Sequence, residues 1–80
     1  MIADSKKVQN DPPQEKIKFI LELFNSSKII DAKKEIEKQT IIYPNSSILF
    51  NILGAILAVQ NNKKEAIENY KKAIKINPNY

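Results

Sequence analysis

Few side chains in this sequence could carry out acid–base, nucleophilic or metal chemistry. The chain of 80 residues contains no Cys and no His, so the commonest thiolate nucleophile, general base and metal ligands are absent. Three carboxylates lie close together in the sequence, at Asp31, Glu35 and Glu37. In a helix, Glu35 and Glu37 point to different faces, and we expect Asp31 and Glu35 to lie on an exposed side among lysines. Because paired-carboxylate catalysis needs a pocket, we predict that the protein is not an enzyme and binds no metal or cofactor.

Lysine is the other residue type that could indicate a partner. The chain has thirteen lysines, no arginine and a formal net charge of +4. Arginine supplies most bidentate contacts to phosphate and guanine, so its absence argues against a nucleic-acid partner. A basic strip near the end of the chain, which we interpret as a solvated face, consists of Lys64, Lys71, Lys72 and Lys75. Contact of this strip with an acidic partner or RNA is the alternative, and a steep salt dependence of binding would distinguish it.

No segment of the sequence is apolar over the length that spans a bilayer. The longest apolar stretch, from Ile48 to Val59, is shorter than the ~20 residues required. The segment before Pro12 is polar and lacks the apolar core of a signal peptide. We therefore predict a cytoplasmic protein without membrane contacts, in which residues 1–12 form a flexible polar arm and residues 13–80 form one domain.

The spacing of apolar side chains predicts four helices. Ile17, Ile20 and Phe24, for example, recur at intervals of three and four residues, which places them on one face of a helix. The third helix is apolar nearly all round, and such a helix must lie between neighbours. Prolines and clusters of Asn and Ser separate the segments. The expected helices span about residues 13–25, 29–41, 47–60 and 63–76.

The sequence repeats at an interval of 34 residues. Shifting the chain by this interval places Pro44 on Pro78. Each of the two resulting units, 13–46 and 47–80, comprises a helix, a short turn, a second helix and a proline. Repeats of this length are typical of solenoids, in which each unit buries its apolar side against its neighbours.

The second unit closely resembles a tetratricopeptide repeat. In this family, small residues stand where the two helices cross, large residues stand between them, and a proline closes the unit. The residues that carry the pattern here are Phe50, Leu53, Gly54, Leu57, Ala66, Tyr70, Ala73 and Pro78. The resemblance implies an all-α fold of two antiparallel helix-turn-helix hairpins, stacked as a short α-solenoid of four helices. It also implies that the protein binds other proteins.

The first unit keeps only part of this pattern. The positions that match are Ala32, Ile36 and Pro44. Lys16, Ile20 and Gln39 stand where the family has an aromatic residue, a glycine and a small residue. We still expect a hairpin of the same kind, because the interval and the order of the elements are kept.

The resemblance places a concave binding face on the first helix of each unit. The corresponding positions carry Gln14, Ile17, Leu21, Phe24 and Asn25 in the first unit and Ile48, Asn51, Ala55, Ala58 and Val59 in the second. This face is mostly apolar, so we expect it to bind an apolar or amphipathic peptide segment of a protein partner. Family members that clamp a terminal carboxylate carry polar groups where this chain has Ile17 and Leu21, so we predict no such clamp. The alternative is that these side chains serve only as core.

Two repeats leave one side of the fourth helix without a neighbour. Ile67, Ala73 and Ile74 are expected to present apolar surface there, and such surface marks interaction sites. Three interpretations are open: the chain is part of a longer repeat protein, it self-associates through this end, or it docks on a partner subunit. In the first case, an alternative function is that of an N-terminal substrate-presenting segment of a larger enzyme, such as a glycosyltransferase or a sulfotransferase.

Overall fold

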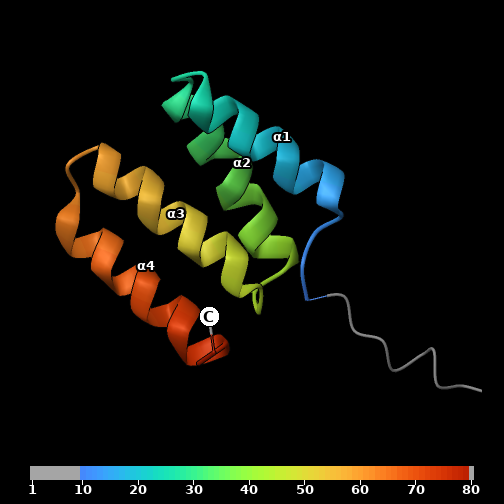
Figure 1. The fold of residues 1–80 in the computed structure, drawn as a ribbon, viewed down its shortest axis with the longest axis vertical. Helices are drawn as coiled ribbons and strands as arrows, with labels where there is room; N and C mark the ends of the chain where they lie inside the picture. The colour runs from blue at the N-terminus through green and yellow to red at the C-terminus, as the bar shows by residue number, and fades with distance from the viewer. Residues whose placement is uncertain (1–9, 80) are drawn as a thin grey trace, which may run out of the picture.

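The computed structural model describes residues 10–79, which form four α-helices (Figure 1). They are α1 (Gln14–Asn25), α2 (Ile29–Ile42), α3 (Ser47–Val59) and α4 (Lys63–Ile76). The predicted all-α fold is confirmed, and this part of the chain contains no strand. The observed helices differ from the predicted ranges only in that α1 begins one residue later, α2 ends one residue later and α3 ends one residue earlier. Residues 1–9 of the predicted arm lie outside the described residues.

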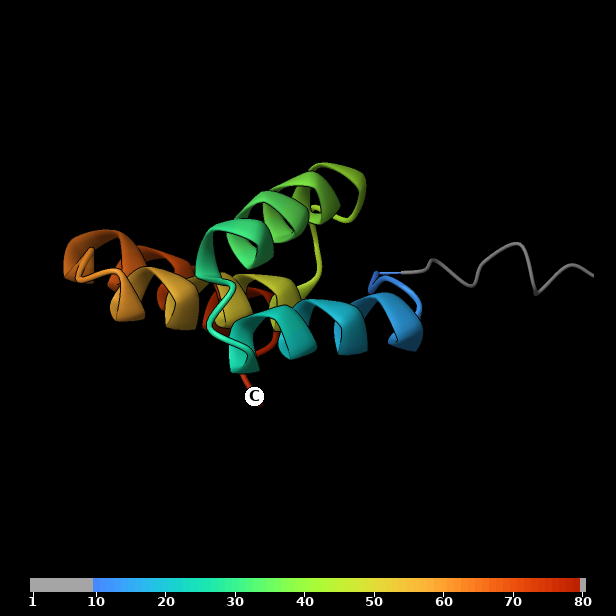
Figure 2. The same ribbon diagram turned by 90° about the horizontal axis from the view of Figure 1, so that it is seen from above.

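The helices form two antiparallel hairpins that stack side by side. α1 and α2 make the first hairpin, α3 and α4 make the second, and α2 packs against α3 where the hairpins meet. Figure 2 shows α2 lying across both α1 and α3, while α1 and α4 occupy the two ends of the stack. Between residues 10 and 79, no helix combines the length and the apolar character needed to cross a bilayer.

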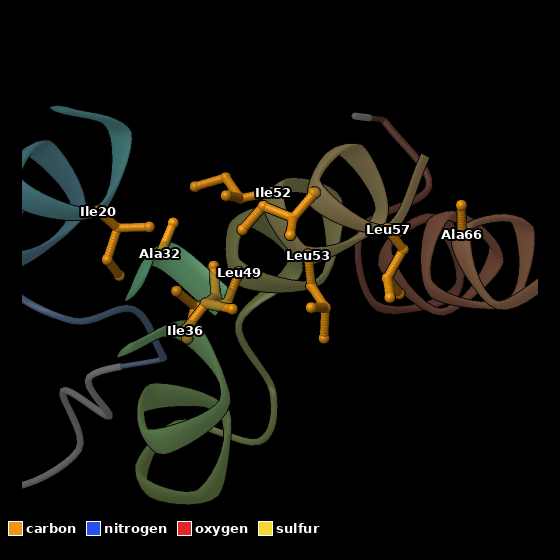
Figure 3. Packing of buried hydrophobic residues seen from close by; sticks show 9 residues of the cluster. Ile20, Ala32, Ile36, Leu49, Ile52, Leu53, Leu57 and Ala66 are labelled. Atoms are coloured by element: carbon orange, nitrogen blue, oxygen red, sulfur yellow. The ribbon is translucent and has the colours of Figure 1, made fainter. Parts of the chain in front are cut away.

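One hydrophobic core runs through both hairpins (Figure 3). Ile20 of α1, Ile36 of α2 and Leu49 of α3 are completely buried in it. The cluster continues along α3 through Leu57 to Ala66 of α4. Complete burial of a side chain as large as Ile or Leu contributes about 1.5–3 kcal/mol, so these residues join the hairpins into one folding unit.

A completely buried serine fixes the start of α3. The Ser46 hydroxyl accepts a hydrogen bond from the Leu49 amide (3.4 Å) and so forms the N-cap of the helix. The same hydroxyl donates a hydrogen bond to Oδ1 of Asp11 (2.6 Å), and the neighbouring Pro12 is buried. Asp11 and Pro12, the last two residues of the predicted arm, are therefore held against the start of α3.

Both hairpin turns have the same backbone geometry at an interval of 34 residues. Ser27 and Asn61 lie in the left-handed region, with φ values of 63° and 67°. In each turn, the N–H of the following residue donates a 2.8 Å hydrogen bond to the carbonyl five residues before it, which is the Schellman arrangement that ends many helices. The two hairpins therefore turn in the same way, although their sequences match the repeat pattern unequally.

The left-handed backbone at Ser27 generates the first prediction. This conformation costs an L-residue about 1–2 kcal/mol, and only Gly adopts it freely. Ser27→Gly is therefore expected to raise the free energy of unfolding by about 0.5–1 kcal/mol, measured by urea denaturation and far-UV circular dichroism. Asn61→Gly should raise it less, because Asn tolerates this region better than Ser.

Ser26→Gly is the matched control, because Ser26 has a φ of −93° and gains nothing from a glycine. A stabilisation of the Ser26 variant equal to that of the Ser27 variant would contradict the explanation by backbone strain.

Candidate functional site

A shallow groove opens between the starts of α1 and α3. Ile17 and Leu21 project into it from the same face of α1, one helical turn apart, and Ile48 lines it from the first turn of α3. The groove has a volume of ≈ 380 Å³. We call it the α1–α3 groove, and its full lining is Asp11, Pro12, Gln14, Ile17, Lys18, Leu21 and Ile48.

The hydrogen bond between Asp11 and Ser46 joins the two helix starts that frame this groove. Asp11 lies shortly before α1, and Ser46 directly precedes α3. The acceptor is a carboxylate and the bond is 2.6 Å long, and hydrogen bonds to an ionised group are stronger than neutral ones. This contact joins the segment before α1 to the start of α3, and the buried Pro12 beside Asp11 forms part of the groove lining.

Four of the ten residues expected on the concave face meet in the groove: Gln14, Ile17, Leu21 and Ile48. Phe24 packs against the core, as Ile17 and Ile48 also do in part. Leu21 is 37% exposed, which is more than a purely structural side chain needs. The remaining five lie on α1 and α3 outside the groove lining: Asn25, Asn51, Ala55, Ala58 and Val59.

Three residues of the groove lining were not predicted from the sequence. Lys18 lies three residues before Leu21, a spacing that places it on the same side of α1, so helical periodicity alone could have found it. Asp11 and Pro12 were assigned to the arm. Their place in the groove depends on contact with the start of α3, which no local sequence pattern reveals.

Comparison with known families identifies the second hairpin. Residues 47–80 match the family model of the tetratricopeptide repeat. Over these residues, which are less than half of the chain, the protein is similar to a tetratricopeptide repeat. Repeats of this family act in general as protein–protein interaction modules, which use the concave surface of the stack. Neither the curated proteins nor the solved structures include a match to this chain.

In this second hairpin, the single glycine of the chain lies against Tyr70 of α4. A methyl group on Gly54 would lie 2.7 Å from Cε1 and 2.8 Å from Cδ1 of Tyr70. The half-buried Tyr70 ring therefore occupies the space that a side chain at position 54 would need. Pro78 is exposed just after the end of α4. The other residues of the pattern on these two helices are buried: Phe50, Leu53, Leu57, Ala66 and Ala73.

One residue of α4 differs from the expectations, and another makes a contact that was not expected. Ala73 was expected on the open surface, but it is only 1% exposed, so it belongs to the buried side of the helix that packs against α3. Lys72 was assigned to a solvated basic strip, and it is exposed. Its Nζ lies 4.7 Å from the centroid of the Phe50 ring, where it forms a cation–π contact with a buried aromatic residue.

Glu35 was expected on an exposed side of its helix, and this prediction is wrong because Lys16 of α1 reaches across to it. The Glu35 side chain is only 15% exposed, and its Oε2 lies 3.0 Å from Nζ of Lys16. Gln39 Nε2 donates a 3.2 Å hydrogen bond to the same oxygen, and Lys38 Nζ lies 3.7 Å from Oε1. The hydrogen bond from Lys16 is the main cause that lowers the pKa of Glu35, and it outweighs the opposing effect of burial.

The contact between Gly54 and Tyr70 generates the second prediction. Gly54→Ala gains about 1 kcal/mol of helix propensity, but it forces the Tyr70 ring to move, and overpacking of this kind costs about 1–3 kcal/mol. The variant is therefore expected to be less stable by about 1 kcal/mol in urea denaturation.

Tyr70→Ala supplies the control background for this prediction. Without the ring, Gly54→Ala should change sign and stabilise the protein by up to about 1 kcal/mol, because only the gain in helix propensity remains. The same destabilisation in both backgrounds would show that the Tyr70 ring is not what requires glycine.

The lowered pKa of Glu35 generates the third prediction. A carboxylate with a folded-state pKa below its unfolded value of about 4.3 stabilises the protein above that pH, and this contribution is lost as the pH falls through the folded pKa. Glu35→Gln should therefore cost about 1 kcal/mol at pH 7, and the difference from the wild type should disappear in acid. Urea denaturation across this pH range measures it. Glu37→Gln, at an exposed position of the same helix, should show no comparable pH-dependent difference.

Proposed function

We propose that this protein is a protein–protein interaction module whose α1–α3 groove binds an apolar or amphipathic peptide segment of its partner. The observation that carries the proposal is the convergence of Ile17, Leu21 and Ile48 from two helices on one open groove of ≈ 380 Å³. This volume lies at the lower end of the range of about 300–1,000 Å³ for ligand pockets. It suits a few apolar side chains of a peptide better than a folded domain.

The apolar lining would supply the affinity of such a complex. Side chains of the partner that cover Leu21 and the exposed parts of Ile17 and Ile48 gain roughly 25 cal/mol for each Å² of apolar surface removed from water. Ile17 and Leu21 lie one helical turn apart, about 5–6 Å, which matches the spacing of side chains four residues apart on a partner helix. An amphipathic helix is therefore the partner geometry that fits best.

The polar residues at the groove favour an internal peptide segment over a free carboxyl terminus. Asp11 and Lys18 bring opposite charges to the lining, so the groove has no excess positive charge with which to attract a carboxylate. Lys16, the other lysine in this part of α1, is paired with Glu35 on the side of α2. The amide of Gln14 can orient a peptide through hydrogen bonds without selecting for charge.

Substitution of Leu21 provides the test of this function and the fourth prediction. Peptides selected from a randomised display library against the wild-type protein should carry apolar residues at helical spacing. Leu21→Lys should weaken their binding at least about tenfold in fluorescence anisotropy, because a charge would replace the exposed centre of the apolar lining.

Ile30→Lys is the matched control, because Ile30 is 66% exposed on α2 and does not line the groove. It should leave peptide binding unchanged, and far-UV circular dichroism should show that both variants are folded. Peptides that bind the Leu21 variant as tightly as the wild type would overturn the assignment of the groove.

A further inference from the structure

α4 ends the stack with a side that is both apolar and basic. Lys64, Ile67, Lys71 and Ile74 follow one another at intervals of three, four and three residues, so they share one side of the helix, which we call the α4 outer face. Ile67 and Ile74 are 52% and 55% exposed, and both lysines are exposed. The exposed Glu68 lies between the two lysines, so the face carries an excess of positive charge rather than positive charge alone. Large apolar side chains exposed next to each other mark a contact surface more often than single ones do.

α1 ends the stack on the opposite side with a surface that is apolar and acidic. Glu15, Phe19 and Glu22 recur at intervals of four and three residues and form the α1 outer face, on which Phe19 is 46% exposed and both glutamates are exposed. The exposed Lys18 lies between the two glutamates, and Nζ of Lys16, which is paired with Glu35, lies 5.5 Å from the centroid of the Phe19 ring. One repeat interval later, the equivalent residues of α3 are buried in the stack: Leu49, Leu53 and Ile56. The α1 outer face is thus the side that a preceding hairpin would cover, but with two carboxylates in place of aliphatic side chains.

We propose that a second copy of this chain docks head to tail, with the α4 outer face of one molecule on the α1 outer face of the next. Ile67 and Ile74 would cover the exposed Phe19 ring, and lysines would meet glutamates around it. Lys18 and Glu68 reduce the charge of the two faces but do not reverse it, so contact between two like ends would still oppose faces with an excess of the same charge. The two charge patterns therefore select the head-to-tail arrangement.

The geometry of this contact determines what the assembly looks like in solution. Each molecule uses two different faces at opposite ends, so a dimer leaves one of each face free and further copies can add. With few large apolar side chains on either face, the contact falls in the class of small, weak interfaces. Because exposed charges define it, salt should weaken the association, whereas salting-out strengthens a purely apolar contact.

Charge reversal in pairs tests the contact and gives the fifth prediction. The wild type should show a weight-average mass that rises with concentration in sedimentation equilibrium without a plateau at the dimer. Glu15→Lys/Glu22→Lys and Lys64→Glu/Lys71→Glu should each weaken this association at least about tenfold, because each variant opposes like charges at the contact. An equimolar mixture of the two variants should associate again, since the altered α1 outer face of one variant is complementary to the altered α4 outer face of the other, and the two unaltered faces are complementary as in the wild type.

Glu37→Lys/Glu65→Lys is the net-charge control for Glu15→Lys/Glu22→Lys, because it raises the net charge by the same four units at exposed positions outside both faces. It should associate like the wild type, and so should Leu21→Lys, which separates this contact from peptide binding in the groove. A wild type that stays monomeric at all concentrations would overturn the proposal. A mixture of the two reversed variants that fails to associate, or reversed variants that associate like the wild type, would also overturn it.

Discussion

α3 is apolar on almost every side, so it is stable only when α2 and α4 pack against it. Stacking the first hairpin on the second meets this requirement through Ile36 of α2 and Leu49 of α3, and Ile20 of α1 belongs to the same buried cluster. α1 packs mainly on α2, so the starts of α1 and α3 remain partly uncovered. The groove between them is therefore a consequence of burying α3 with the fewest helices.

The first hairpin departs from the repeat pattern at several positions, and two of these residues contact the same side chain in the structure. Lys16 occupies the position equivalent to Phe50, and Gln39 occupies the position equivalent to Ala73. In the second hairpin, the aromatic and the small residue are both buried. In the first, Lys16 and Gln39 both bind Glu35. A polar contact between α1 and α2 thus occupies these positions in the first hairpin. Both turns keep the left-handed conformation at equivalent residues, Ser27 and Asn61.

The helices could be predicted from the sequence almost residue by residue, because apolar periodicity and the prolines act locally. Gly54 could also be placed, because a glycine inside an apolar helix points to a close approach of another element. The burial of Glu35 could not, since its partner Lys16 lies on a different helix and the pattern of α2 alone suggests an exposed carboxylate. The same holds for Asp11, whose contact with Ser46 joins residues 35 positions apart. Sequence periodicity identifies which side of a helix is apolar, but polar contacts between helices require the packed structure.

α1 has two separate surfaces, and neither of them is fully covered by another helix. Leu21 faces the groove, and Phe19, two residues earlier, points about 160° away from it because successive residues in a helix are rotated by about 100°. A peptide in the groove and a second copy at the end of the stack would therefore not compete for the same side chains. Head-to-tail stacking would also place successive grooves on one continuous side of the assembly. A partner carrying several apolar segments would then bind with an avidity set by the number of stacked copies, even though each groove is small.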